Sequence, residues 1–196
     1  HIATLRQQRK PSRLSLLKTL KNVENQKTES TAIYLRKDRR HIQDEDVFLL
    51  RKHIKSKLNL EMSLNKEIVN IALKVKPDSV CIVPEGRKEL TTEGGLDVFS
   101  QKVRIENVVK KLKKKNIFVS LFIDPEEKQV ISVKEVGADA VEIHTGKYAN
   151  STTHFQTKNE LNKIKKISRL VLKLGLQLNA GHGLDYDNVK PITKVK

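Results

Sequence analysis

The chain has 196 residues, and its 39 Lys and Arg against 23 Asp and Glu give a formal net charge of +16. It shows neither a targeting-peptide pattern nor an apolar run of the roughly 18 residues that a membrane span needs, so we expect neither secretion nor membrane insertion. The single cysteine, Cys81, lies in an apolar run and indicates a buried residue in a reducing compartment, so we expect a cytoplasmic protein.

The positive charge is compatible with nucleic acids or with small anionic ligands. The lysines are spread along helical faces, as in 110–115, and aromatic residues make up only 4% of the chain. Since stacking platforms for bases are therefore scarce, we do not expect a nucleic-acid-binding protein.

Short apolar segments alternate with helix-like segments every ~25 to 35 residues, which is the pattern of βα units. Strands are predicted at 31–36, 57–62, 79–84, 119–124, 139–144 and 176–180. Helices are predicted after Asp44 as N-cap, over 64–75, from Asp124-Pro125-Glu126-Glu127 to Gly137, and over 161–174 before Gly175.

No linker interrupts this pattern, so we predict one α/β domain over residues 1–196, a TIM (β/α)8 barrel. A complete barrel typically needs about 250 residues. The chain opens without Met and stops where another strand is expected, so we expect the barrel to be incomplete at both ends.

Residues that can exchange protons stand at the ends of four predicted strands, namely Glu61, Asp124, Glu142 with His144, and His182. Barrel enzymes carry their chemistry at the carboxyl ends of the strands, so this recurrence favours an enzyme. Asp124 also opens a strong helix-start signature, and we assign it to a helix cap.

His182 lies between Gly181 and Gly183, which permit unusual backbone angles and the close approach of a ligand. The following loop can offer N–H groups to an anion, and we favour this interpretation over a surface histidine in a turn. Glu61 follows apolar Leu60, where partial desolvation would suit a general acid or base; a structural ion pair is the alternative. Glu142 has the same two interpretations and shares a strand face with His144.

Two loops offer polar groups to a ligand, and the first of them has the chemistry of phosphate binding. The basic run Arg36–His41 follows a strand end, where a guanidinium suits bidentate phosphate recognition, although a basic run is also typical of a solvated loop. The loop Thr91–Asp97 offers hydroxyls and a flexible backbone. No run has the spacing of a metal site, so we expect no metal.

Taken in order, seven segments resemble the pyridoxine 5′-phosphate synthase family over essentially the whole chain. They are His1–Arg6, Leu35–Ile42, Asn59–Met62, Val83–Glu85, Thr91–Asp97, Glu142–Gly146 and Asn179–Leu184. The resemblance implies a (β/α)8 barrel that condenses 1-deoxy-D-xylulose 5-phosphate with 3-amino-2-oxopropyl phosphate, without metal or organic cofactor. It also implies a ring-like homo-oligomer, an octamer.

The resemblance further implies roles for individual residues. Glu61 matches a general base, His182 a proton donor and Glu142 a transition-state stabiliser. The groups that hold the deoxyxylulose phosphate match His1, Arg36, His41 and Thr91, and those that hold the aminoacetone phosphate match Arg9 and Gly183.

One position departs from the family pattern. Tyr34 stands where the family has a second general-base histidine, and an unperturbed phenol with a pKa near 10 is a poor base at neutral pH. This leaves two alternatives to the synthase, a catalytically impaired barrel retained as a binding or assembly protein and another phosphate-handling (β/α) barrel lyase. A strand-end lysine would favour the lyase, and none stands out in the predicted strands.

Overall fold

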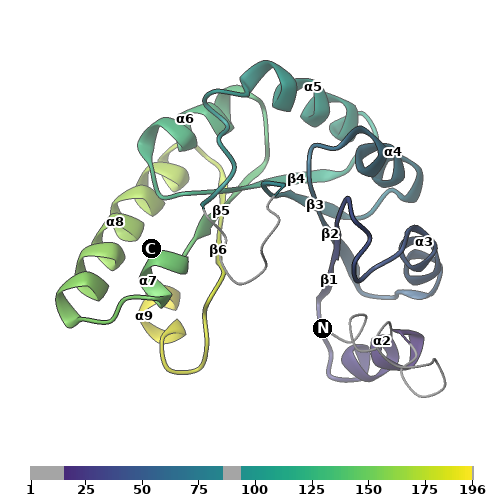
Figure 1. Ribbon diagram of the computed structural model, residues 1–196, viewed down its shortest axis with the longest axis horizontal. Coiled ribbons are helices and arrows are strands. Elements are labelled where there is room, and N and C mark those ends of the chain that lie inside the picture. Colours follow the sequence, from purple (N-terminus) through teal and green to yellow (C-terminus); the bar gives the residue numbers. More distant parts are fainter. Residues whose placement is uncertain (1–15, 86–93, 196) are drawn as a thin grey trace. The chain divides into compact units, whose positions relative to one another are not determined.

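The computed structural model describes residues 16–85 and 94–195, which form alternating strands and helices (Figure 1). The chain divides into two compact units, one of His1–Cys81 with Lys111–Phe118 and the other of Ile82–Lys110 with Val119–Lys196. Six strands follow one another in the sheet in the order of the sequence, β1 to β6. The described fold is therefore an α/β fold with a parallel sheet, as predicted.

The strands are β1 (Ser30–Leu35), β2 (Lys57–Met62), β3 (Ser79–Ile82), β4 (Phe118–Ile123), β5 (Ala140–His144) and β6 (Gln177–Gly181). The helices are α2 (Leu16–Asn25), α3 (Asp44–His53), α4 (Lys66–Val75), α5 (Lys102–Lys113), α6 (Glu127–Glu135), α7 (Gly146–Ala149), α8 (His154–Lys173) and α9 (Val189–Thr193). All six predicted strands are confirmed, and β2 has the predicted bounds.

In the first unit, β1 and β2 pair in parallel, and their register sets Tyr34 opposite Glu61. Leu58, Leu60 and Met62 of β2 are fully buried, whereas the alternating Glu61 is only partly buried. This period of two places the apolar side chains in the core and leaves the strand-end carboxylate at its margin.

The predicted cap of α3 is wrong by one residue. The helix is capped at Gln43, whose backbone N–H donates to Asp46 Oδ2 over 2.9 Å. Asp44 already lies in the first turn, where its carboxylate accepts the Nε–H of Arg39 over 2.8 Å. An acid there still interacts favourably with the helix N-terminus, but it is engaged by an arginine and not by the helix amides.

In the second unit, β4 pairs with β5 and β5 with β6, all in parallel. Residues 119–123 of β4 are buried without alternation, which is typical of a parallel strand covered on both faces. Helix α6 packs on β5, and α8 packs on both β6 and α6. On α8, Ile164, Ile167 and Val171 are buried, and the predicted Gly175 ends the helix at a φ of +70°.

The assignment of Asp124 to a helix cap is also wrong. Helix α6 begins at Glu127 and Glu126 takes the cap position, while the backbone N–H of Glu126 donates to the carbonyl of Asp124 over 2.7 Å. Asp124 is thus set in the turn between β4 and α6, and its carboxylate is directed elsewhere.

The same hydrogen bond, from a backbone N–H to an aspartate carboxylate, recurs where two of the strands begin. The carboxylate of Asp78 accepts the N–H of Leu58, the carboxylate of Asp139 accepts the N–H of Val119, and each distance is 2.9 Å. Each aspartate lies just before a strand and bonds to the preceding strand in the chain. These bonds fix the register of neighbouring strands, and with it which residues meet at the opposite ends.

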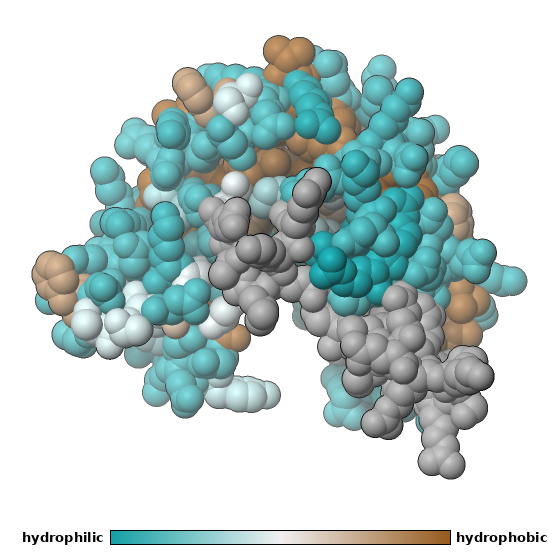
Figure 2. Space-filling view, in the orientation of Figure 1, coloured by the Kyte–Doolittle hydropathy of each residue, from teal (hydrophilic) through white to brown (hydrophobic). Residues whose placement is uncertain are grey.

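Hydrophilic residues dominate the described surface on the face drawn in Figure 2. This fits the interpretation of the lysines as solvated along helical faces. Across residues 16–85 and 94–195, no helix combines the length and apolarity that crossing a membrane requires.

Candidate functional site

The carboxyl ends of β4, β5 and β6 carry the strand-end acids and imidazoles of the second unit, which are Asp124, Glu142, His144 and His182. In the register of β5 and β6, Glu142 lies opposite Asn179 and His144 opposite Gly181. Asp124 directly follows β4, and His182 directly follows β6. Parallel pairing thus gathers the strand ends at one edge, as the sequence pattern predicts.

Asp124 and His144 form the central pair of this edge. His144 Nδ1 lies 2.9 Å from Asp124 Oδ1, and the His144 side chain is only 4% exposed. An ionised carboxylate can only accept a hydrogen bond, so Nδ1 carries the shared proton. The pair therefore fixes the orientation and the tautomer of the imidazole.

His182 is held in an unusual backbone conformation at the end of β6. Its φ is +86°, and Gly183 after it has a φ of +71°, so the turn relies on the histidine as well as on the predicted glycine. The Thr145 hydroxyl lies 2.6 Å from both the Gly181 and the His182 carbonyl oxygens. These contacts fasten the strained segment to the end of β5.

The His182 ring packs against two other rings. The His144 and His182 centroids are 5.1 Å apart, and Phe122 lies 5.0 Å from His144 and 6.4 Å from His182. His182 itself is exposed at this edge. An accessible imidazole backed by a buried imidazole and a phenyl ring is suited to proton transfer with a ligand.

Glu142 depends on a neighbouring glycine for its position. A Cβ added to Gly181 would lie 2.5 Å from Glu142 Oε1, closer than such atoms approach. The carboxylate thus occupies space above β6 that any other residue at 181 would fill.

The segment after residue 93 lies against the end of β4. The backbone N–H of Leu96 donates to the Phe122 carbonyl over 2.7 Å, and a Cβ on Gly95 would overlap the backbone of Ile123 and Asp124. The buried Gln129 of α6 accepts the N–H groups of Val98 and Phe99 and donates to Asp97. The glycines of the predicted loop thus serve close backbone packing beside Asp124.

The electrostatics of this edge follow from these contacts. The pKa of Asp124 is lowered, chiefly by the hydrogen bond from His144, with a further bond from the Gly95 N–H, against the opposing effect of burial. The pKa of His182 is also lowered, first by burial and then by repulsion from His144. Asp124 is therefore charged at neutral pH, and His182 gives up its proton more readily than an ordinary histidine.

In the first unit, Arg36 follows β1 and is 7% exposed. Its Nε and Nη2 donate to the two carboxylate oxygens of Asp38, each over 3.0 Å, and its guanidinium lies 5.8 Å from the Tyr34 ring centroid. The Arg36 hydrogen bonds lower the pKa of Asp38 to about 2. A phosphate bound by Arg36 would therefore share the guanidinium with Asp38.

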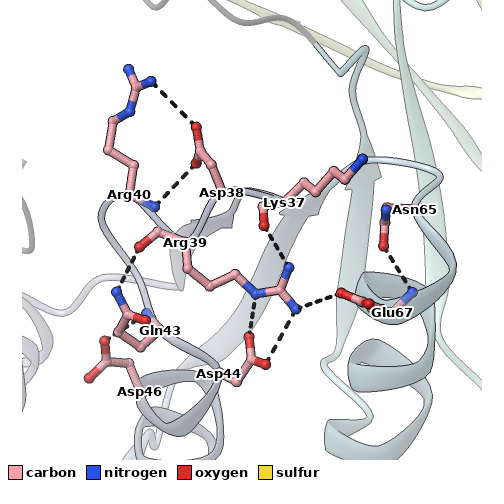
Figure 3. A network of polar contacts seen from close by, with 9 residues as sticks. All are labelled: Lys37, Asp38, Arg39, Arg40, Gln43, Asp44, Asp46, Asn65 and Glu67. Atoms are coloured by element: carbon pink, nitrogen blue, oxygen red, sulfur yellow. Dashed lines mark hydrogen bonds and ion pairs between the residues drawn. The ribbon is translucent and has the colours of Figure 1, made fainter.

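The remaining basic residues of this loop have different surroundings. Figure 3 shows Arg39 directed toward Asp44 and Glu67, whereas Arg40 reaches toward Asp38. Arg39 thus ties the loop to the first turns of α3 and α4. His41 is 6% exposed, so the run is not simply a solvated loop.

The structure brings Glu142, His182 and Gly183 together in the second unit, and it places Glu61, Arg36 and His41 at or after strand ends of the first. The assigned residues His1, Arg9 and Thr91 lie outside the described residues. Sequence reasoning missed the contact between Asp124 and His144. The sequence did contain a signal for this contact, because both residues stand at the ends of consecutive strands.

Parallel strands with acids and imidazoles at their carboxyl ends define this chain as an α/β protein with the layout of an enzyme. The family model described as pyridoxal phosphate biosynthesis protein PdxJ matches residues 1–196. The chain belongs to this family.

Curated relatives agree with this assignment. The chain is 48% identical over 195 residues to the pyridoxine 5′-phosphate synthase of a Synechococcus species, covering 100% of this chain and 82% of that protein. It is 47% identical over 196 residues to the synthase of Pseudoalteromonas translucida, covering 100% and 81%. Among solved structures, the phosphodiesterase PaMucR in its c-di-GMP complex matches with a TM-score of 0.50 at 15% identity, over 78% of this chain and 68% of that one, and shows the fold alone.

Proposed function

We propose that this chain is a pyridoxine 5′-phosphate synthase, which condenses 1-deoxy-D-xylulose 5-phosphate with 3-amino-2-oxopropyl phosphate into pyridoxine 5′-phosphate, inorganic phosphate and water. The observation that carries the proposal is the 48% identity to a synthase of that name over the whole length of this chain. The strand-end acids and imidazoles supply the residue types that the reaction needs.

The reaction is a series of proton transfers around two bond-forming steps. The amine of one substrate attacks the ketone of the other, and water leaves to give a Schiff base. Ring closure by carbon–carbon bond formation, with loss of phosphate and of a second water, then yields the pyridine. We assign Glu61 as a general base, His182 as a proton donor and Glu142 as a stabiliser of positive charge in the transition state. The exposure of His182 and the position of Glu142 over Gly181 support these roles.

Binding of the two phosphates needs cationic or N–H donors. We assign the deoxyxylulose phosphate to Arg36 and His41, together with His1 and Thr91, and the aminoacetone phosphate to Gly183 and Arg9. The place of Arg36 directly after β1 supports its role, because a guanidinium at a strand end suits phosphate recognition.

The proposal also covers the fold, the cellular location, the oligomeric state and the cofactors of the enzyme. The sequential strand order supports a single (β/α)8 barrel domain as its fold. We further propose a cytoplasmic homo-oligomer that acts without metal or organic cofactor.

Supplying both phosphorylated substrates tests this function directly, with pyridoxine 5′-phosphate measured by chromatography. We expect product from the unaltered protein and a loss of about 10²- to 10⁴-fold in kcat for His182→Asn, the usual contribution of an acid–base group. His154→Asn, at the start of α8, is the matched control and should keep full activity. An unaltered protein that forms no product would overturn the proposal.

Tyr34 favours a second candidate, a barrel that binds these substrates without converting them. Tyr34 lies opposite Glu61 in the register of β1 and β2, at a position where the family has a general base. Retention of both substrates in equilibrium dialysis, without product, would select this candidate.

A further inference from the structure

One pair at the edge of the second unit, the buried His144 and the partly buried Asp124, has no part in the roles assigned above. Asp124 accepts the Nδ1 hydrogen of His144 over 2.9 Å, and the two residues come from consecutive strand ends. Register bonds at strand beginnings, such as the one that the Val119 N–H donates to the Asp139 carboxylate, already hold β4 and β5 together. The sheet therefore has its own anchor, and the pair of Asp124 and His144 calls for another explanation.

The geometry links this pair to His182. A single point, the Cβ position of Gly146, lies 2.5 Å from His144 Nε2 and 3.1 Å from His182 Cδ2. The two imidazoles thus flank the same glycine, with ring centroids 5.1 Å apart. Because the backbone of His182 is strained and its side chain exposed, its ring depends on these neighbours for a fixed orientation.

His144 is placed to support a reacting group and not to react itself. It is 5% exposed, and Gly146 lies against its Nε2. A substrate at the strand ends would meet the exposed His182 instead. The buried imidazole thus acts on the reaction through its neighbour.

We propose that Asp124 and His144 form a positioning pair that holds the His182 imidazole in place for proton donation. The inference rests on the proposed function, since that function gives His182 its role. The carboxylate fixes the His144 ring by accepting its Nδ1 hydrogen, and the fixed ring in turn supports the face of His182. Even a weak contact that orients the His182 ring can affect kcat strongly, because a small displacement of a reacting group slows the reaction.

The charge environment agrees with this arrangement. Among the titratable groups at this edge, His144 acts on His182 directly, Asp124 bonds to His144, Lys147 of α7 acts on Asp124, and Glu142 of β5 lies against Gly181 beside His182. Repulsion from His144 contributes to the lowered pKa of His182. Removal of the His144 ring should therefore move the titration of His182 to higher pH.

The test uses Asp124→Asn and His144→Asn in the full chain. The first keeps the shape but removes the charge, and the second keeps an amide donor near Asp124 but removes the ring. Asp187→Asn and His154→Asn are matched controls, because they make the same chemical changes at exposed positions of the second unit that have no assigned role. We expect kcat to fall about 10- to 100-fold in both test variants with KM nearly unchanged, while the controls keep full kcat.

Two readouts separate positioning from a merely structural role. In NMR titrations of labelled histidine, with His182 assigned by its own variant, His144→Asn should raise the pKa of His182. The double variant should lose no more activity than the more impaired single variant, because the pair acts as a unit.

Wild-type kcat in both test variants would overturn the inference. So would a loss of activity that follows only the melting temperature, with the His182 titration unchanged. If the unaltered protein makes no pyridoxine 5′-phosphate, the proposed function fails on that assay, whereas the His182 titration still reports the coupling between the rings.

Discussion

Gly181 leaves the space in which the carboxylate of Glu142 sits. In Gly181→Ala, the new methyl would lie 2.5 Å from Oε1, so the carboxylate must move. We expect kcat of the synthase reaction to fall about 100-fold, because a displacement near 1 Å is that costly, while unfolding free energy falls by only about 1–3 kcal/mol. Steady-state kinetics and urea unfolding measure the two effects.

Gly175→Ala is the matched control for this substitution. Gly175 has a φ of +70° with no atom within 4 Å of its added Cβ, so alanine there strains the backbone by about 1–2 kcal/mol without touching the strand ends. Its turnover should equal that of the unaltered protein. Equal turnover in Gly181→Ala would show that the position of Glu142 is unimportant.

Asp38 makes stability depend on pH in a defined window. Its folded-state pKa is about 2, below the value near 4 of an unfolded aspartate, because Arg36 donates to it. The unfolded chain then binds more protons between these values, so the stabilisation is complete above about pH 4 and lost as pH falls through about 2. The Asp38 side chain is 43% exposed, and solvent screening limits the effect to less than about 1 kcal/mol.

Urea unfolding of the unaltered protein and of the Asp38→Asn variant over this pH range measures how the unfolding free energy depends on pH. The difference in unfolding free energy should be near zero at about pH 2 and constant above about pH 4. If the difference in unfolding free energy between the two proteins stayed unchanged down to about pH 2, the lowered pKa of Asp38 would not be its cause.

At the scale of elements, Gln129 joins α6 to the segment before α5. Its buried side chain accepts two backbone N–H groups, from Val98 over 2.8 Å and from Phe99 over 3.1 Å. Gln129→Leu leaves both donors without this acceptor, and we expect a loss of about 2 kcal/mol and a fall in Tm of about 4–8 °C. Calorimetry measures this loss, and Lys128→Ala on the exposed side of α6 should change Tm little. An unchanged Tm in Gln129→Leu would show that the segment is anchored by other contacts.

The pairing of β1 with β2 makes Tyr34 a direct test of the site. Tyr34 and Glu61 are register partners on adjacent strands. If β1 contributes to the chemistry, Tyr34→His supplies an imidazole with a pKa near neutrality, and we expect kcat to rise at least about tenfold. Tyr34→Phe is the control that removes the hydroxyl without adding a base, and it should not raise turnover. An unchanged kcat in Tyr34→His would remove this position from the mechanism.

The elements themselves were largely predictable, because apolar runs and helix periodicity depend on local sequence. Residues 57–62 form a strand with the predicted bounds, and α8 ends just before Gly175 as predicted. The contacts of Asp124 were not predictable in this way. Its Asp-Pro-Glu-Glu context matches a helix start, yet its partner His144 lies 20 residues away and meets it only through the pairing of β4 with β5. The strained φ of His182 depends likewise on Thr145 from another strand end.

For the molecule as a whole, the charge of +16 has a consequence for the rate of substrate capture. Both proposed substrates carry phosphate, so a positive protein should attract them from solution. The attraction is long-ranged at low salt and is screened within about 3 Å at about 1 M salt. We therefore expect kcat/KM to fall at least about tenfold between about 0.01 M and 1 M salt, with kcat nearly constant.

Steady-state kinetics over this salt range, compared with a variant of lower charge, test the attraction. Lys114→Gln with Lys115→Gln removes two positive charges from exposed positions just after α5. The variant should have a shallower dependence of kcat/KM on salt and an unchanged kcat, because steering acts on encounter and not on the chemical steps. A flat salt dependence in the unaltered protein would show that its charge does not assist capture, whereas a falling kcat would place the salt effect on the chemical steps.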